Sequence, residues 1–205
     1  MEPRIISIIG SPGVGKSFLV KKLAEKLNAV PILEEGKEIP ERIIDNFKNE
    51  SRQMETIIFF RNRLLENIRD AIEIKSQGRV VVMDTWLITN ELHIPTMISG
   101  FEQEILLNHA KFDKDFMPLP DAMIFLDASE EIIRNLTIKR GRDYDTNEKF
   151  IQRNLSIRKS HEDYYNKNKD SLIYINRDKL DFENEEDLQR VINAIEKIPK
   201  NVKDV

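Results

Sequence analysis

The chain carries the stretch Gly10-Ser11-Pro12-Gly13-Val14-Gly15-Lys16-Ser17, which matches the pattern G-x-x-x-x-G-K-[ST]. This stretch follows a β-branched run at 5–9 and begins a segment with helical spacing of apolar residues. Glycines here let backbone N–H groups turn inward, and a helix start adds partial positive charge, so the segment suits phosphate. A glycine-rich turn with a solvated lysine is the alternative, but it leaves the flanking strand and helix unexplained. We therefore predict a nucleoside triphosphate site at residues 10–17, with Lys16 at the β- and γ-phosphates and Ser17 on Mg²⁺.

Outside this loop, short apolar runs alternate with longer amphipathic stretches. The runs are nearly continuous, which is typical of strands that helices bury on both faces; they lie at 5–9, 30–33, 80–83, 122–126 and 172–175. The stretches between them repeat apolar residues at helical spacing. This alternation predicts an α/β protein with three layers. We expect the clearest long connection at 109–121, which contains Pro118 and Pro120.

Composition limits the classes of protein and partner. A chain of 205 residues predicts one domain, 1–199, followed by a frayed tail at 200–205. The net charge of −4 argues against a polymeric nucleic acid as partner, and the absence of cysteine excludes disulfides. No apolar run is long enough for a signal peptide or a membrane span, so we expect a cytoplasmic protein with no membrane partner.

Carboxylates follow three of the predicted strands, at the edge where open parallel sheets place their chemistry. Asp84 follows the run 80–83 and resembles a Walker-B aspartate that supports Mg²⁺; a helix N-cap or a loop position is its alternative. Glu34 and Glu35 follow the second run, where a catalytic base and a solvated turn are evenly matched readings. Asp127 fits a structural role, because residues 127–130 have the form of a capping box.

A basic segment at 139–143 contains Arg140, Gly141 and Arg142. A glycine within such a cluster is typical of a mobile loop, whose arginines could stabilise charge on a transferring phosphoryl group. Taken alone, the segment is better explained as a basic helix C-terminus that complements the helix dipole.

Together these features resemble the deoxynucleoside kinases over about residues 4–176. The resemblance implies that Glu35, with Glu34 as the neighbouring alternative, is the base for a 5′-hydroxyl. It also implies that Arg140 and Arg142 belong to a lid near 139–146.

The resemblance further implies an acceptor pocket built by Gln53, Arg61, Trp86 and Asn90. Arg61 stands where the family places a base-reading arginine, and Asn90 stands where many members carry its aspartate partner. Thr85 and Trp86 replace the arginine and serine of the family's Glu/Asp-Arg-Ser motif. The segment 83–89 is also similar to one in nicotinamide riboside kinases.

We therefore expect a P-loop NTPase fold of three α/β/α layers, with a five-stranded parallel sheet in the order 2-3-1-4-5. The expected reaction is transfer of the ATP γ-phosphoryl group to the 5′-hydroxyl of a (deoxy)nucleoside, with ATP and Mg²⁺ as cofactors and a homodimer as the assembly. Nicotinamide riboside and a nucleoside monophosphate are the alternative acceptors. An NTP-hydrolysing regulatory module without a small acceptor is the alternative of another class.

Overall fold

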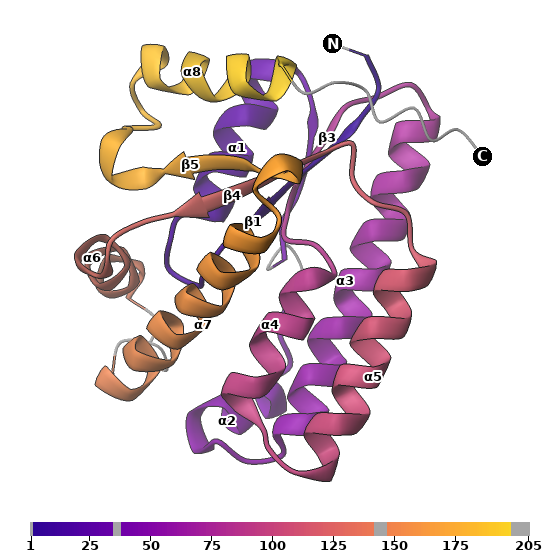
Figure 1. Cartoon of the computed structure of the whole chain (residues 1–205), viewed down its shortest axis with the longest axis vertical. Helices are drawn as coiled ribbons and strands as arrows, with labels where there is room; N and C mark the ends of the chain where they lie inside the picture. The colour runs from indigo at the N-terminus through magenta and orange to yellow at the C-terminus, as the bar shows by residue number, and fades with distance from the viewer. Residues whose placement is uncertain (1, 35–37, 142–146, 198–205) are drawn as a thin grey trace.

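The structure is a computed structural model that describes residues 2–34, 38–141 and 147–197. Its strands are β1 (Ile5–Ile9), β2 (Val30–Ile32), β3 (Val81–Asp84), β4 (Ala122–Asp127) and β5 (Ile173–Asn176). They form one sheet in the order β2-β3-β1-β4-β5, and all four neighbouring pairs are parallel. The predicted fold class and strand order are therefore confirmed (Figure 1).

Eight helices connect and cover the strands within the described residues: α1 (Lys16–Leu27), α2 (Glu41–Asn49), α3 (Gln53–Ser76), α4 (Ile88–Met97), α5 (Phe101–Phe116), α6 (Glu130–Arg140), α7 (Glu148–Lys167) and α8 (Glu185–Glu196). Two short 3₁₀ helices, η1 (Lys169–Ser171) and η2 (Arg177–Lys179), flank β5. Among these residues, no helix combines the length and the apolar character needed to cross a membrane.

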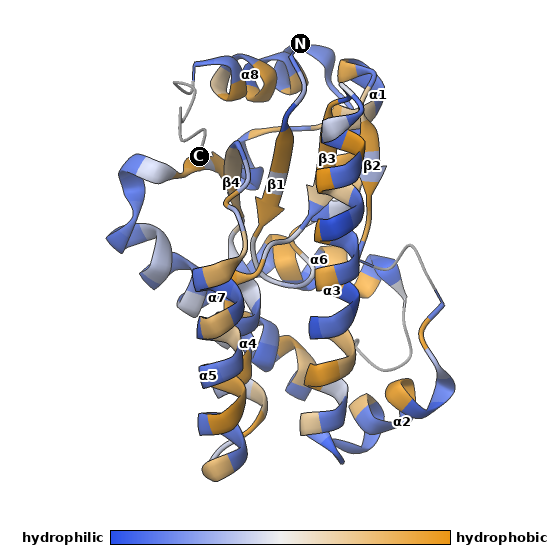
Figure 2. Cartoon of the chain, turned by 90° about the vertical axis from the view of Figure 1, so that its right-hand side faces the viewer, coloured by the Kyte–Doolittle hydropathy of each residue, from blue (hydrophilic) through white to orange (hydrophobic). Residues whose placement is uncertain are grey.

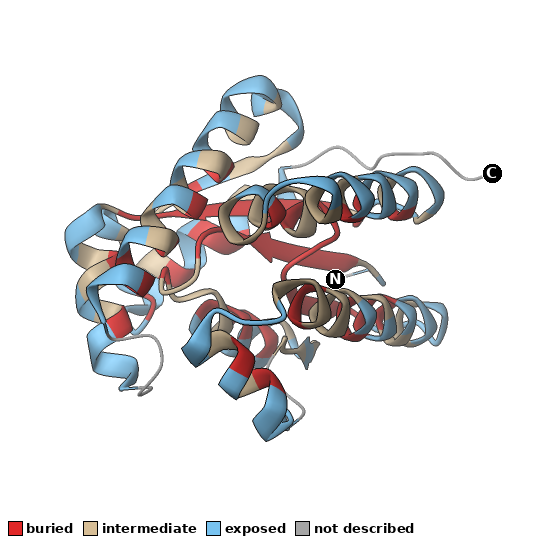
Figure 3. Cartoon of the chain, turned by 90° about the horizontal axis from the view of Figure 1, so that it is seen from below, coloured by how far each residue is buried: buried red, intermediate tan, exposed pale blue. Residues whose placement is uncertain are grey.

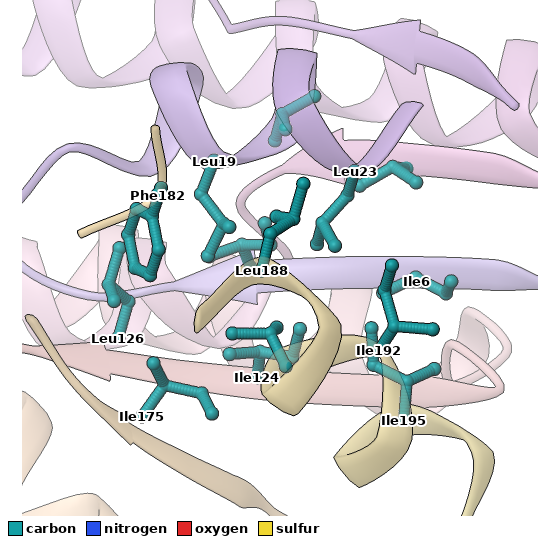
Figure 4. Packing of buried hydrophobic residues seen from close by; sticks show 14 of the residues in the cluster. Ile6, Leu19, Leu23, Ile124, Leu126, Ile175, Phe182, Leu188, Ile192 and Ile195 are labelled. Atoms are coloured by element: carbon teal, nitrogen blue, oxygen red, sulfur yellow. The ribbon is translucent and has the colours of Figure 1, made fainter. Parts of the chain in front are cut away.

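The central strands β1, β3 and β4 are buried on both faces, because successive side chains of a strand point to opposite sides and helices cover both sides. The edge strands β2 and β5 are only partly buried. Ile6 and Ile8 of β1 belong to the cluster that α1 and α8 cover, whereas Ile5 and Ile9 belong to the cluster that α3 covers. Figure 4 shows the first cluster, in which side chains of α1 and α8 pack over β1 and β4. The resulting band of buried residues runs through the middle of the molecule in Figure 3. The continuous apolar runs of the sequence reflect this two-sided burial.

The connection expected at 109–121 is wrong for most of its length, because α5 continues to Phe116. Leu106 and Ala110 of α5 pack with Ile94 of α4 and Ile57 of α3 in a third cluster, and this packing stabilises the helix. The connection from α5 to β4 is therefore short. Figure 2 shows α4 and α5 beside each other below the sheet.

The capping residue of α6 also differs from the expectation. Asp127 is the last residue of β4, and its carboxylate accepts hydrogen bonds from Arg158 at 2.9 and 3.2 Å and from the Tyr174 hydroxyl at 3.1 Å. The N-cap is Ser129, whose side chain accepts a bond from the backbone N–H of Ile132. Asp127 thus pairs with the partly exposed Arg158 and joins β4 to α7, which is a structural role other than capping.

Candidate active site

The loop between β1 and α1 has a backbone that glycine alone accommodates. Gly10 and Gly13 have φ of 151° and 85°, in the left-handed region that side chains disfavour. A Cβ atom would lie 2.3 Å from the Leu126 carbonyl oxygen at Gly10 and 2.3 Å from Thr137 Oγ1 at Gly13. The loop is therefore pressed against the end of β4 and against α6.

Lys16 begins α1 and folds back over this loop. Its Nζ donates hydrogen bonds to the carbonyl oxygens of Gly10 at 3.1 Å and Ser11 at 3.2 Å, and it lies 4.0 Å from Asp84 Oδ1. A cation held above the N-terminus of a helix, beside inward-turned glycines, creates a positive site for phosphate oxygens.

Asp84 is the last residue of β3 and lies beside Ile8 of β1 in the parallel register. The strand pairing places this carboxylate at the start of α1, where Ser17 Oγ donates to Asp84 Oδ2 at 2.5 Å. The residue is 3% exposed, and Oδ1 is buried without a hydrogen-bond partner. A buried carboxylate with an unsatisfied oxygen next to a serine hydroxyl suits a hard divalent cation.

Two adjoining cavities lie at this edge of the sheet. The phosphate cavity, of about 240 Å³, is lined by Pro12, Gly13, Gly15, Lys16, Ser17, Phe18, Glu34, Asp84, Thr85, Thr89, His93, Leu136 and Arg140. The apolar cavity, of about 150 Å³, is lined by Pro12, Glu34, Ile39, Ile44, Phe47, Ile57, Phe60, Thr85, Thr89, Asn90, His93, Ile94, Met97, Arg140, Arg153, Asn154 and Ile157. Their shared wall consists of Pro12, Glu34, Thr85, Thr89, His93 and Arg140. A group bound at the phosphate loop would therefore face a second group in the apolar cavity.

Thr85 is the strained residue of this shared wall. Its φ of 76° is unusual for a β-branched side chain. Its N–H donates to the Ile8 carbonyl at 3.0 Å, its carbonyl accepts from Ser7 Oγ at 3.1 Å, and its Oγ1 lies 2.6 Å from Thr89 Oγ1. These bonds hold a conformation that the sequence did not predict, and strained backbone of this kind clusters at functional sites.

His93 of α4 is a second residue of the shared wall that the sequence analysis missed. Burial lowers the pKa of its imidazole well below the usual value, and the neighbouring His161, Lys16 and Arg153 lower it further. The ring is therefore neutral near pH 7. No local pattern marks this histidine, because only packing brings α4 against the phosphate loop.

Two of the predicted acceptor residues lie elsewhere. Trp86 is 2% exposed and packs in the core cluster under the sheet, so it does not line either cavity. Arg61 donates to both oxygens of Asp113 on α5, at 2.5 and 2.6 Å, and is also absent from the two linings. Trp86 therefore contributes to core packing and Arg61 to an ion pair between α3 and α5, and their expected contact with an acceptor stays a prediction.

The other predicted residues divide into three groups. Asn90 lines the apolar cavity and Arg140 lies in the shared wall, and their contacts with an acceptor and a phosphoryl group stay predictions. Gln53 begins α3 and does not line either cavity, although its Oε1 is buried without a partner. Glu35 and Arg142 lie outside the described residues, whereas Glu34 lies in the shared wall.

Known proteins resemble this chain in sequence and in fold. The curated deoxyadenosine/deoxycytidine kinase of Bacillus subtilis (strain 168) is 29% identical over 154 residues, which cover 69% of this chain and 67% of that protein. The structure of deoxyadenosine kinase from M. mycoides with bound dATP has a TM-score of 0.75 at 17% identity, covering 94% of this chain and 99% of that chain. For the thymidylate kinase from Candida albicans the TM-score is 0.72 at 17% identity, over 95% of this chain and 92% of that chain. These similarities confirm the resemblance to deoxynucleoside kinases.

One family model matches most of the chain. It is described as an AAA domain and matches residues 9–151. This span includes the phosphate loop with Lys16, the strand-end carboxylate Asp84 and the helix that ends at Arg140. Since the match takes in the described parts of the phosphate cavity and far more than half of the chain, the protein belongs to this AAA domain family of P-loop proteins.

Proposed function

We propose that the protein transfers the γ-phosphoryl group of Mg-ATP to the 5′-hydroxyl of a (deoxy)nucleoside. The observation that carries this proposal is the pair of adjoining cavities, one at the phosphate loop and one apolar, with a shared wall between them. A kinase needs the donor phosphate and the acceptor hydroxyl to meet in line, and catalysis then rests on positioning and charge stabilisation. The protein is accordingly a P-loop kinase.

The donor side uses the loop 10–17. Its backbone N–H groups and Lys16 bind the ATP phosphates, while Ser17 and Asp84 are the residues that would hold Mg²⁺. The bound ion would neutralise charge on the phosphate oxygens. Asp84 can serve an ion because its Oδ1 is buried without a partner and its Oδ2 already touches the serine hydroxyl.

The transfer step forms a bond between the acceptor oxygen and the γ-phosphorus and breaks the bond to the leaving ADP oxygen. The acceptor's proton goes to a carboxylate, for which Glu34 and Glu35 are the candidates. Glu34 lies in the shared wall, which favours it on position. Arg140, in the same wall at the end of α6, stabilises charge on the transferring group, and residues 139–146 are the proposed lid.

The lining of the apolar cavity suits a flat heteroaromatic base. Phe47 and Phe60 supply aromatic surface, and the amides of Asn90 and Asn154 supply donors and acceptors for its edge. The Asn90 Nδ2 is buried without a partner, which suits a ligand acceptor. The names of the relatives, a deoxyadenosine/deoxycytidine kinase and a deoxyadenosine kinase, support a deoxynucleoside.

A nucleoside monophosphate is the second candidate acceptor. Arg153 lines the apolar cavity and could bind the charge of a monophosphate, and the similar fold of thymidylate kinase fits such an acceptor. The hydrolysing-module interpretation has less support, because a module without a small acceptor does not need a second, apolar cavity beside the phosphate loop.

ADP formation with Mg-ATP and a panel of acceptors tests the proposal. The panel contains the four deoxynucleosides, the ribonucleosides, nicotinamide riboside and the deoxynucleoside monophosphates. We expect ADP to form only when a nucleoside is present. The matching nucleoside 5′-monophosphate should form at the same time. Equal ADP formation with and without every acceptor would instead identify a hydrolase.

The two candidate bases are separated by Glu34→Gln and Glu35→Gln. The substitution of the base should reduce kcat strongly while ATP binding in Mg²⁺ stays near that of the wild type, because the base touches only the acceptor. The other substitution serves as the matched control. If both variants keep the kcat of the wild type, the proposal that a carboxylate acts as the base is contradicted.

The oligomeric state and the cellular location of the protein are separate predictions. We expect a homodimer, as the resemblance implies, and the exposed face of α5 is a candidate surface for the contact. The cytoplasmic location expected from the sequence stays a prediction.

A further inference from the structure

The imidazole of His93 lies where the two cavities meet. It lines both the phosphate cavity and the apolar cavity. Thr89, Asn90 and Met97 of the same helix, α4, also line the apolar cavity, and each lies three or four positions from His93, so the four side chains share one face. A ligand that reaches from one cavity into the other therefore passes the shared wall that contains this ring.

The Nε2 atom of His93 is buried and has no hydrogen-bond partner among the described residues. In the shared wall, as far as the structure describes it, no other side-chain nitrogen or oxygen is in this situation. Thr85 and Thr89, in contrast, bond to each other through their hydroxyl groups. A buried polar atom without a partner costs stability, so its presence in a native fold requires an explanation. A ligand in the adjoining cavities can supply the missing partner.

The surroundings of the ring oppose a positive charge on it. Helices α4 and α7 lie next to each other (Figure 1), and the rings of His93 and His161 are 5.5 Å apart between their centres. Burial lowers the pKa of His93 most strongly, and His161, Lys16 and Arg153 lower it further. A neutral imidazole keeps one nitrogen that donates a hydrogen bond and one that accepts.

In the proposed reaction, the acceptor spans the two cavities. Its base fits the apolar cavity beside Phe47 and Asn90, neither of which lines the phosphate cavity. Its reacting hydroxyl must meet the γ-phosphoryl group in line, and that group belongs in the phosphate cavity with Lys16. The hydroxyl therefore comes to the shared wall, where His93 has its unpartnered nitrogen.

We propose that Nε2 of His93 hydrogen-bonds the reacting hydroxyl of the acceptor and holds its oxygen in line with the γ-phosphoryl group. This role rests on the proposed function. The hydroxyl donates its own proton to the carboxylate, Glu34 or Glu35, so its oxygen accepts the bond and Nε2 carries the hydrogen. The imidazole orients the oxygen and does not take its proton, because burial and the nearby cations disfavour the charged ring.

Steady-state kinetics of His93→Leu and His93→Gln test this role, with Mg-ATP and the nucleoside that the wild type phosphorylates best. Leucine removes the hydrogen bond, so kcat/KM for the nucleoside should fall roughly tenfold, while the KM for ATP should change less than about twofold. The amide of glutamine reaches the place of Nε2 and can donate, so His93→Gln should recover most of this loss. His93→Asn should resemble His93→Leu, because its shorter side chain brings the amide only to the place of Nδ1.

A matched control and urea unfolding separate this role from a structural one. His109→Leu, at an exposed position of α5, should have the kinetics of the wild type. His93→Leu should keep or raise the urea midpoint, because it removes a buried nitrogen without a partner, whereas a packing role beside His161 requires a lower midpoint.

Three results would each overturn the role of His93. They are an unchanged kcat/KM in His93→Leu, equal kinetic losses in His93→Leu and His93→Gln, and a clearly lowered urea midpoint of His93→Leu. A wild type that phosphorylates no nucleoside would instead contradict the proposed function itself, and with it the role that rests on it.

Discussion

As the pH falls, His161 should destabilise this fold at a higher pH than the protonation of most carboxylates does. His161 lies on α7 and is completely buried. Its Nδ1 donates to the Ile157 carbonyl at 3.0 Å, and its ring lies parallel to that of Phe125 at 6.3 Å. Burial lowers the pKa of the imidazole from 6.5 to about 4; Lys16 also lowers it, and the bond to Ile157 opposes the shift.

The sign follows from the two states of the chain. The unfolded chain takes up the proton near pH 6.5, whereas the folded chain resists it down to about pH 4. The neutral His161 therefore makes its full contribution to the free energy of unfolding above pH 6.5. This contribution is lost as the pH falls from about 6.5 to about 4. Each pH unit in this window costs about 1.4 kcal/mol, so a change from pH 7 to pH 5 should remove about 2 kcal/mol.

Urea unfolding of the wild type and of His161→Phe at pH 7, 6 and 5 measures this contribution. Phenylalanine keeps an aromatic ring beside Phe125 but cannot take up a proton. The variant should lose about 2 kcal/mol less than the wild type between pH 7 and pH 5, while carboxylates far from residue 161 affect both proteins alike. Parallel losses in the two proteins would refute a neutral, buried His161.

Three further outcomes concern the phosphate loop and the lid. Lys16→Ala should abolish phosphoryl transfer and leave the urea midpoint nearly unchanged; activity within a few-fold of the wild type would contradict the assigned role. Arg140→Ala should lower kcat more than it raises the acceptor KM, because its charge acts in the transition state, and a change in KM alone would oppose this view. Gly13→Ala should destabilise the fold by roughly 1–3 kcal/mol more than Gly78→Ala in urea unfolding, because the new methyl group collides with Thr137. Both glycines have a φ near +85°, but no atom lies within 4 Å of an added Cβ at Gly78. Equal losses of stability in the two variants would therefore show that the backbone conformation, and not the collision with Thr137, causes the destabilisation.

The phosphate loop and the sheet were predictable from sequence because their signals are local. The pattern at residues 10–17 needs only its own spacing, and two-sided burial produces continuous apolar runs in the central strands β1, β3 and β4. Asp84 followed from the same logic, since a residue after a parallel strand lies at the sheet edge where the loop begins. The strand order came from the resemblance and not from the runs themselves.

Only the tertiary structure decided which side chains line the apolar cavity. Helical spacing shows that residues share a face but not what that face contacts, so it did not indicate that Arg61 of α3 pairs with Asp113 of α5. Trp86 packs in the core next to Thr85, whose positive φ no local pattern predicts. His93 entered the shared wall because α4 packs beside the phosphate loop. These positions depend on contacts between segments far apart in the chain, and therefore on packing that periodicity within one segment cannot express.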